Sequence, residues 1–355
     1  MMIRRILHAL VLGLGAQRAL ADGGSSRWNL KELKSLVTFG NSYTDESRLG
    51  YFIEHKEAPP VGWRAPESNS TSTGGFIWPR YVSRYTGAEL YNYAVSGAVC
   101  SNNITPRYFD ALDAPFPSVE QYEIPAFLED AHHTDPATGK PFLNLPRRET
   151  VYAIWIGTND LGNDAFMTDS QVPGKTLVDY VECIFGALDR LYDHGGRYFV
   201  LMNVAPLDLL PQYAPPERGG VPGTPFWPEK PENITQVSHR MKQAVVAVNE
   251  IMELKMGSAM RHRYRGAGVA VFDTYSLLSD MYYDPGRYFN GTEPPNVEGW
   301  IKHCDLDGNN CEAKPSPDSY MWYDELHPSE QTDRIIAQQF VHVIHGVSTY
   351  ATYFG

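Results

Sequence analysis

Three residues of the sequence have the chemistry of an acyl-transfer site. Ser42 carries a hydroxyl group, which is a weak nucleophile and needs a base within hydrogen-bond reach. His327 can take the proton, and Asp324, three residues earlier, can fix the histidine tautomer and stabilise the imidazolium. We therefore predict that Ser42, His327 and Asp324 form a catalytic triad.

The same reaction needs hydrogen-bond donors for the oxyanion of the tetrahedral intermediate. The backbone N–H groups of Ser42 and Gly97 and the side-chain amide of Asn159 are the candidates. Gly97 lacks a Cβ atom, so the backbone there can approach a substrate closely. Each signal is weak alone, because Ser and Gly are common turn residues and Asn often caps a helix. An oxyanion hole is favoured because the three residues follow the ends of successive predicted strands.

The elements that must position these residues form an alternating pattern. Apolar and β-branched runs predict strands at 35–39, 90–94, 151–156, 198–202 and 269–272. Helical periodicity predicts helices at 177–192, 235–256 and 329–344. Such alternation is typical of a parallel sheet with helices on both faces, where ligands bind beyond the carboxyl ends of the strands. No linker interrupts the pattern, so we expect one domain over residues 22–355.

Four separated motifs together resemble the SGNH, or GDSL-type, hydrolase superfamily. They are Gly40-Asn41-Ser42, Gly97, Gly157-Thr158-Asn159-Asp160 and Asp324-Glu325-Leu326-His327. The resemblance covers essentially the whole chain after residue 21. It implies a three-layer α/β/α sandwich with a flavodoxin-like parallel sheet of strand order 2-1-3-4-5. It also implies the triad of Ser42, His327 and Asp324 and an oxyanion hole from Ser42, Gly97 and Asn159.

The chain departs from the family pattern at one position. Asn41 stands where the family usually has Asp. The amide keeps the size and hydrogen-bonding ability of the carboxyl group but loses its charge. Because Asp324 remains as the triad acid, we expect activity to persist.

Longer segments are most similar to fungal acetyl esterases of carbohydrate esterase family 16. The resemblance rests on segments 39–45, 92–98 and 156–160, and on Trp322-Tyr323 just before Asp324. It implies removal of acetyl groups from xylo-oligosaccharides and related hemicellulose fragments, without a cofactor or metal. A lipase or broad acyl hydrolase on longer acyl esters, and a non-catalytic secreted sugar-binding protein, are the alternatives.

Aromatic residues near the predicted loops give modest independent support for a sugar substrate, because aromatic faces stack on sugar rings. Trp322 is the predicted substrate-binding residue, since it flanks the Asp/His pair. Four others lie in or beside loops, although most such residues are ordinary packing aromatics: Trp63, Trp78, Trp227 and Tyr323.

The N-terminus and the cysteines indicate an extracellular protein. Arg4 and Arg5, an apolar run over 6–16 and small residues at 19–21 predict a signal peptide over residues 1–21. Sequons at Asn69, Asn103, Asn233 and Asn290 are candidate glycosylation sites. In an oxidising compartment Cys304 and Cys311 are expected to form a disulfide, whereas Cys100 and Cys183 either pair or are buried thiols.

Composition excludes several classes of protein. The chain has 355 residues, with 30 Lys and Arg against 42 Asp and Glu, a formal net charge of −12. This balance argues against a nucleic-acid partner, which needs a basic surface. No stretch after the N-terminus is apolar enough to span a bilayer. We expect a secreted monomer whose partner is an acetylated oligosaccharide.

One pair repeats the spacing of the predicted triad. Asp130 and His133 are separated as Asp324 and His327 are. The pair follows a helical segment rather than a strand and leads into a polar loop. We interpret it as a solvated helix end.

Overall fold

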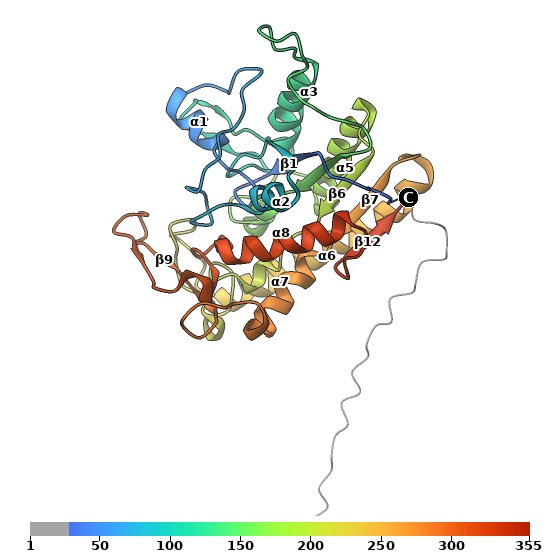
Figure 1. Cartoon of the computed structure of the whole chain (residues 1–355). Helices are drawn as coiled ribbons and strands as arrows, with labels where there is room; N and C mark the ends of the chain where they lie inside the picture. The colour runs from blue at the N-terminus through green and yellow to red at the C-terminus, as the bar shows by residue number, and fades with distance from the viewer. Residues whose placement is uncertain (1–27) are drawn as a thin grey trace, which may run out of the picture.

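The computed structural model describes residues 28–355, so the predicted signal peptide lies outside the described residues. A central six-stranded sheet has the order β12-β7-β6-β5-β1-β2 (Figure 1). Its strands are β1 (Ser35–Gly40), β2 (Glu89–Asn92), β5 (Thr150–Trp155), β6 (Tyr198–Met202), β7 (Gly268–Phe272) and β12 (Ala351–Phe354).

The five predicted strands and their order are confirmed. β2, β1, β5, β6 and β7 are parallel neighbours, which is the order 2-1-3-4-5 in the chain. All residues of β1, β5, β6 and β7 are buried, as expected when helices cover both faces of a sheet. The sequence pattern did not predict β12, which pairs antiparallel with β7 at the edge of the sheet.

Helices cover both faces of the sheet (Figure 1). On one face α2 (Trp78–Thr86) packs against α8 (Glu330–Ile344). On the other face α5 (Leu177–His194) packs against α6 (Ile234–His262) and α3 (Ile124–His132). The predicted three-layer α/β/α sandwich is confirmed, and so are the three predicted helices, with α6 longer than expected.

Shorter elements connect these layers. The remaining helices are α1 (Arg48–His55), α4 (Thr158–Leu161) and α7 (Thr274–Tyr283). Short strands form three small pairs outside the main sheet: β3 (Tyr108–Phe109) with β4 (Ala114–Pro115), β9 (Lys302–His303) with β10 (Glu312–Ala313), and β11 (Tyr320–Trp322) with β8 (Asn296–Trp300).

Local sequence signals explain where the longest predicted helices begin and end. α5 begins with a capping box, in which Thr176 and Asp179 satisfy each other's backbone N–H groups, and ends at Gly195. α8 begins at the N-cap Ser329, whose hydroxyl accepts from the Thr332 N–H. Because α8 starts just after His327, this cap also fixes where the predicted triad loop joins the helix.

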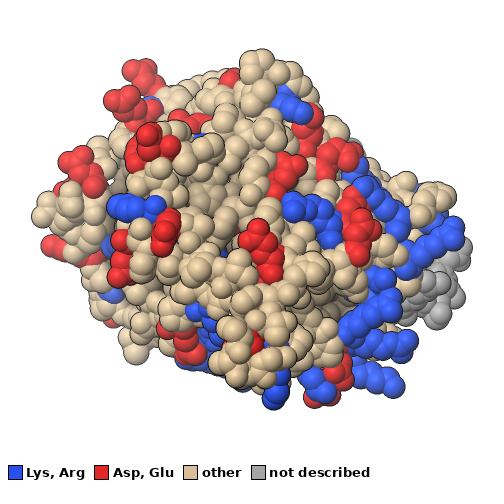
Figure 2. All heavy atoms as spheres, turned by 90° about the horizontal axis from the view of Figure 1, so that it is seen from above, with Lys and Arg blue, Asp and Glu red and all other residues tan. Residues whose placement is uncertain are grey.

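The surface is mixed in charge. Figure 2 shows Lys and Arg gathered mainly along one edge of the face that it views, whose middle is largely covered by uncharged residues. Among residues 28–355, no helix has both the length and the apolar character needed to cross a membrane.

Candidate active site

The turn that follows β1 presents Ser42 at the carboxyl edge of the sheet. The N–H groups of Thr44 and Asp45 both donate to the carbonyl of Asn41, at 2.9 Å each, which folds the chain into a tight turn. Gly40 just before it has φ +150°, and a Cβ there would collide with the carbonyl oxygen of Trp155. Only glycine fits this position, so the Gly40-Asn41-Ser42 motif has a direct steric cause.

Ser42, His327 and Asp324 form a continuous hydrogen-bonded chain. The His327 Nε2 atom lies 2.9 Å from Ser42 Oγ. On the other side of the ring, Nδ1 lies 2.8 Å from Asp324 Oδ1 and 3.0 Å from Oδ2. Ser42 and His327 are each 6% exposed, so the pair is largely shielded from water. This is the arrangement in which a histidine can take a proton from a serine while a carboxylate orients it.

Neighbouring groups fix the loop that carries Asp324 and His327. The Tyr323 N–H donates to the His327 carbonyl at 2.9 Å. The Tyr43 hydroxyl, one residue after Ser42, donates to the Leu326 carbonyl at 2.7 Å. The Phe226 ring lies edge-on to the His327 ring, with centroids 5.2 Å apart. The nucleophile turn and the histidine loop are therefore joined directly.

The three predicted oxyanion donors line one cavity of about 420 Å³ together with His327. Within residues 28–355, no hydrogen-bond partner occupies the backbone N–H of Ser42 or that of Gly97. The Asn159 Nδ2 atom donates one hydrogen to the Ala98 carbonyl at 2.8 Å, which leaves its second hydrogen for a ligand. Three donors are thus available around the space next to the Ser42 hydroxyl.

The backbone at Gly97 is held in a conformation that requires glycine. Gly97 has φ +91°, and an added Cβ would lie 2.9 Å from the Phe116 ring. The Arg107 guanidinium donates to the Gly97 carbonyl through Nη1 at 2.7 Å. Burial lowers the pKa of Arg107 from its ordinary value. Gly97 is therefore fixed both by packing and by a charged donor.

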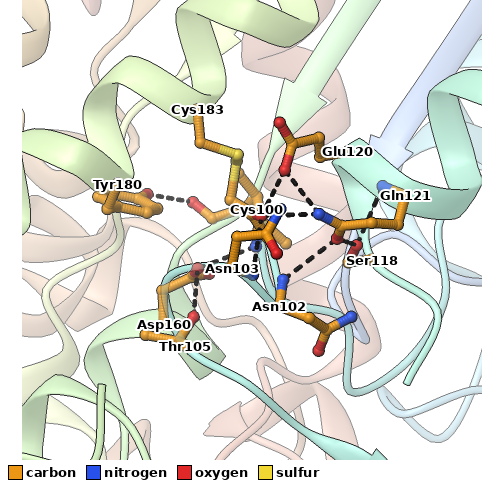
Figure 3. Close-up of a disulfide and its surroundings, with 12 residues drawn as sticks. Cys100, Asn102, Asn103, Thr105, Ser118, Glu120, Gln121, Asp160, Tyr180 and Cys183 are labelled. Atoms are coloured by element: carbon orange, nitrogen blue, oxygen red, sulfur yellow. Dashed lines mark hydrogen bonds between the residues drawn. A yellow bond between two sulfur atoms is a disulfide. The ribbon is translucent and has the colours of Figure 1, made fainter. Parts of the chain in front are cut away.

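A disulfide and a buried carboxylate anchor the same loop (Figure 3). Cys100, three residues after Gly97, is bonded to Cys183 of α5. The Asp160 Oδ1 atom accepts from the Cys100 N–H at 2.9 Å and from the Thr105 hydroxyl at 3.1 Å. Burial raises the pKa of Asp160 to about 6. The carboxylate next to Asn159 thus ties the loop after β5 to the loop after β2.

The four cysteines form two disulfides. The predicted Cys304–Cys311 pairing is confirmed. For Cys100 and Cys183 the sequence left two possibilities, and the structure contains the disulfide.

Two further carboxylates that sequence reasoning missed join the loops after β1 and β2. Glu123, fully buried, accepts from the Gly40 N–H at 2.8 Å and from the Val95 N–H at 3.2 Å. Burial raises its pKa well above the ordinary value. Asp45 accepts from the Ser96 N–H at 2.7 Å. Asp45 ends the segment that resembles the acetyl esterases, but nothing local in the sequence identifies Glu123.

Trp322 is fully buried and does not line the cavity of Ser42, so its interpretation as a substrate-binding residue is wrong. Its side chain is 0% exposed, and its indole N–H donates to the Val297 carbonyl at 2.7 Å. Trp322 packs in the core beneath the loop of Asp324 and His327. Trp78 and Trp227 are also buried, whereas Trp63 lines an open groove.

The pair Asp130 and His133 takes no part in this site, but its interpretation as a solvated helix end is wrong for Asp130. Asp130 is 5% exposed and accepts from the Tyr93 hydroxyl at 2.8 Å and the Gly62 N–H at 2.7 Å. It therefore joins a loop to the core. Among the residues that the structure describes, no group of three or more His, Cys, Asp or Glu side chains is arranged to hold a metal ion.

Comparison with known proteins agrees with this architecture. The family model described as GDSL-like Lipase/Acylhydrolase matches residues 36–340. The chain is 41% identical over 328 residues to an acetylesterase of Hypocrea jecorina, covering 91% of this chain and 92% of that protein. It is 24% identical over 350 residues to an acetylesterase of Thermothelomyces thermophilus, covering 94% and 96%.

Among solved structures, an acetylxylan esterase from Geobacillus stearothermophilus is similar at 14% identity with a TM-score of 0.40, covering 89% of this chain and 95% of that chain. The expected resemblance to GDSL-type hydrolases and fungal acetyl esterases is confirmed by the family model and by the relative from H. jecorina. Because the family model spans most of its length, the chain belongs to the GDSL-like lipase/acylhydrolase family.

Proposed function

We propose that this protein is a secreted serine acetylesterase that removes O-acetyl groups from hemicellulose-derived oligosaccharides, above all acetylated xylo-oligosaccharides. The observation that carries the proposal is the hydrogen-bonded chain from Ser42 through His327 to Asp324, beside three free donors in one cavity. A carboxylic ester hydrolase of the serine type needs these groups and no cofactor.

Acylation follows from the positions of these groups. The Ser42 oxygen attacks the acetyl carbonyl carbon while His327 Nε2 takes the hydroxyl proton. Asp324 stabilises the resulting imidazolium through Nδ1. The carbonyl oxygen becomes an oxyanion, which accepts hydrogen bonds from the N–H groups of Ser42 and Gly97 and from the Asn159 amide. Collapse of this intermediate breaks the ester C–O bond, and His327 returns the proton to the departing sugar oxygen.

Deacylation uses the same groups, with water as the nucleophile and Ser42 as the leaving group. Water loses a proton to His327 and attacks the carbonyl carbon of the acetyl-Ser42 ester. The second tetrahedral intermediate occupies the same oxyanion hole. When it collapses, Ser42 recovers its proton from His327, and acetic acid leaves and loses its own proton to solvent as acetate.

Two aromatic rings border the catalytic groups, and the names of two relatives support the acetyl preference. The Phe116 ring packs against Gly97, and the Phe226 ring packs against His327, so aromatic rings stand beside both the oxyanion donors and the base. The named activity of two relatives, acetylesterase, is the same chemistry.

The remaining covalent features support secretion. Two disulfides are expected to persist only in an oxidising compartment. The sequon side chains at Asn69, Asn103, Asn233 and Asn290 are all exposed, so glycans there would not disturb the core. That the mature protein is a monomer remains a prediction.

A series of 4-nitrophenyl esters from acetate to octanoate tests the acyl preference. We expect kcat/KM to be highest for acetate and to fall as the chain lengthens. A maximum at octanoate would instead establish a lipase or broad acyl hydrolase. If no ester is hydrolysed and a fluorophosphonate fails to label Ser42 in folded protein, a non-catalytic sugar-binding role replaces both.

A further inference from the structure

A second cavity, which we call the α1 groove, runs beside the active site. It has a volume of about 680 Å³ and is lined by α1 and by the loop over residues 63–72. Leu49, Ser72 and Ser96 line both this groove and the cavity of Ser42. The two spaces therefore meet at shared walls, and a molecule whose ester lies at Ser42 has room to continue into the groove.

The polar lining of the α1 groove consists mainly of hydroxyl groups. Tyr51, Ser68, Ser70 and Thr71 are among the residues that line it, and Ser72 and Ser96 stand at the junction. Hydroxyl groups both donate and accept hydrogen bonds, which matches a ligand whose own groups are hydroxyls.

Two of the three carboxylates that line the α1 groove are engaged by protein donors. Asp45 accepts from the backbone N–H groups of Arg48, Leu49 and Ser96. Glu46 is paired with Arg80 through two hydrogen bonds of 2.8 and 2.7 Å. The third carboxylate of the lining, Glu54, is exposed on α1. Because two of the three carboxylates are satisfied by protein donors and hydroxyl groups dominate the polar lining, the groove favours a neutral ligand.

Trp63 supplies a rigid aromatic wall. Its ring lies 5.0 Å from the Arg48 guanidinium and 5.0 Å, edge-on, from the Tyr51 ring. Arg48 is in turn fixed by two hydrogen bonds to the Asn92 carbonyl. The half-buried Trp63 is thus held in place while it borders the groove, which suits stacking against the apolar face of a sugar ring.

We propose that the α1 groove binds the neutral sugar chain of the substrate, so that the enzyme recognises an oligosaccharide and not only its acetyl group. This inference rests on the proposed function, because the sugar chain is the alcohol part of the ester cleaved at Ser42. Binding in the groove orients the acetylated ring and lowers KM for longer chains.

Gly50 allows a sharp test. It is an exposed residue of α1 that lines the groove, and a Cβ added there would meet nothing within 4 Å. Gly50→Leu therefore fills the groove with an apolar side chain while improving the helix propensity of α1. The matched control is Gly186→Leu, because Gly186 is an exposed glycine of α5 whose Cβ also meets nothing within 4 Å.

The measurement compares kcat/KM for acetylated xylotetraose with kcat/KM for 4-nitrophenyl acetate. We expect Gly50→Leu to lower the ratio of the two by about tenfold or more, mainly through KM of the oligosaccharide. Trp63→Ala should lower the same ratio, Trp63→Phe should restore most of it, and Gly186→Leu should leave it at the wild-type value. An unchanged ratio in Gly50→Leu, or a selective loss on 4-nitrophenyl octanoate, would overturn the proposal.

Calorimetric titration with unacetylated xylotetraose separates this inference from the proposed function. We expect wild type and Gly186→Leu to bind the sugar and Gly50→Leu to bind it at least about tenfold more weakly. If the protein binds in this way but cleaves no acetyl ester, the proposed function fails and the sugar groove stands. If acetate esters are cleaved and Gly50→Leu binds the sugar as wild type does, the groove proposal fails alone.

Discussion

Asp324 contacts His327 at both its side chain and its backbone. The Oδ1 atom of Asp324 lies 2.8 Å from the imidazole Nδ1 and also accepts the His327 backbone N–H at 2.8 Å. One carboxylate oxygen thus shapes the turn and orients the ring. The turn and the catalytic geometry are parts of the same local structure.

Asp324→Asn tests this relationship. An amide keeps an oxygen for the backbone N–H but cannot stabilise an imidazolium as a carboxylate does, and it favours the wrong histidine tautomer. We expect kcat for 4-nitrophenyl acetate to fall by about 10³–10⁴-fold with little change in thermal stability. If kcat of the folded variant falls by less than tenfold, Asp324 is not the triad acid.

Asn159→Ala tests the oxyanion hole. Removing the amide takes away one donor to the developing negative charge, so kcat should fall by about 10²–10³-fold with KM little changed. Thermal melting of the variant checks that loss of the hydrogen bond to the Ala98 carbonyl has not unfolded the loop. An effect confined to KM would mean that Asn159 binds substrate and does not stabilise the transition state.

The two disulfides should differ in their contribution to stability. Cys100 and Cys183 are 83 residues apart, whereas Cys304 and Cys311 are 7 residues apart. Loop-closure entropy gives about 4.5 kcal/mol for the long loop and about 2.4 kcal/mol for the short one. In denaturant unfolding, the double variant Cys100→Ser/Cys183→Ser should therefore lose more free energy of unfolding than Cys304→Ser/Cys311→Ser. Equal losses, or the reverse order, would contradict this account.

The stability of the fold should decrease with rising pH through Glu325. Burial, with a smaller effect of Asp324, raises the pKa of Glu325 to about 7 from its ordinary value of 4.5. Between these values the unfolded chain releases a proton that the folded chain keeps, so the unfolded state gains relative stability as pH rises. Below about pH 4 both states are protonated and the effect is absent.

Glu325→Gln removes this ionisation. We expect the variant to exceed wild type in free energy of unfolding by roughly 1–3 kcal/mol at pH 8, with the difference shrinking toward pH 4. The exposed Glu312→Gln serves as the control and should follow the wild-type pH dependence. A Glu325→Gln difference that is constant from pH 4 to pH 8 would rule out this titration as the cause.

Strong local patterns explain why much of the fold is predictable. The apolar runs of β1, β5, β6 and β7 are buried on both faces, so burial leaves a continuous signal in the sequence. β12 is different, because its four residues are only half-buried at the sheet edge. Its short sequence therefore lacks the continuous apolar run that predicts a buried strand.

The site also contains residues that the sequence predicts and residues that it does not. Ser42, Gly97, Asn159, Asp324 and His327 follow strands or precede a helix, and the fold rule brings such positions together. The prediction that Trp322 binds substrate is wrong because a residue close to Asp324 in sequence can still point its ring into the core. Glu123 acts across the fold from the π-helical turn Val119–Glu123, where no local pattern marks a link between two loops.

Release of acetate from acetylated xylo-oligosaccharides, compared between wild type and Ser42→Ala, tests the central claim most directly. Ser42→Ala removes only the hydroxyl that lies 2.9 Å from His327 Nε2 and leaves the surrounding backbone intact. We predict that wild type releases acetate and that the folded variant releases it about 10⁵–10⁶-fold more slowly. Acetate release by Ser42→Ala at the wild-type rate would contradict a Ser42-dependent acetylesterase.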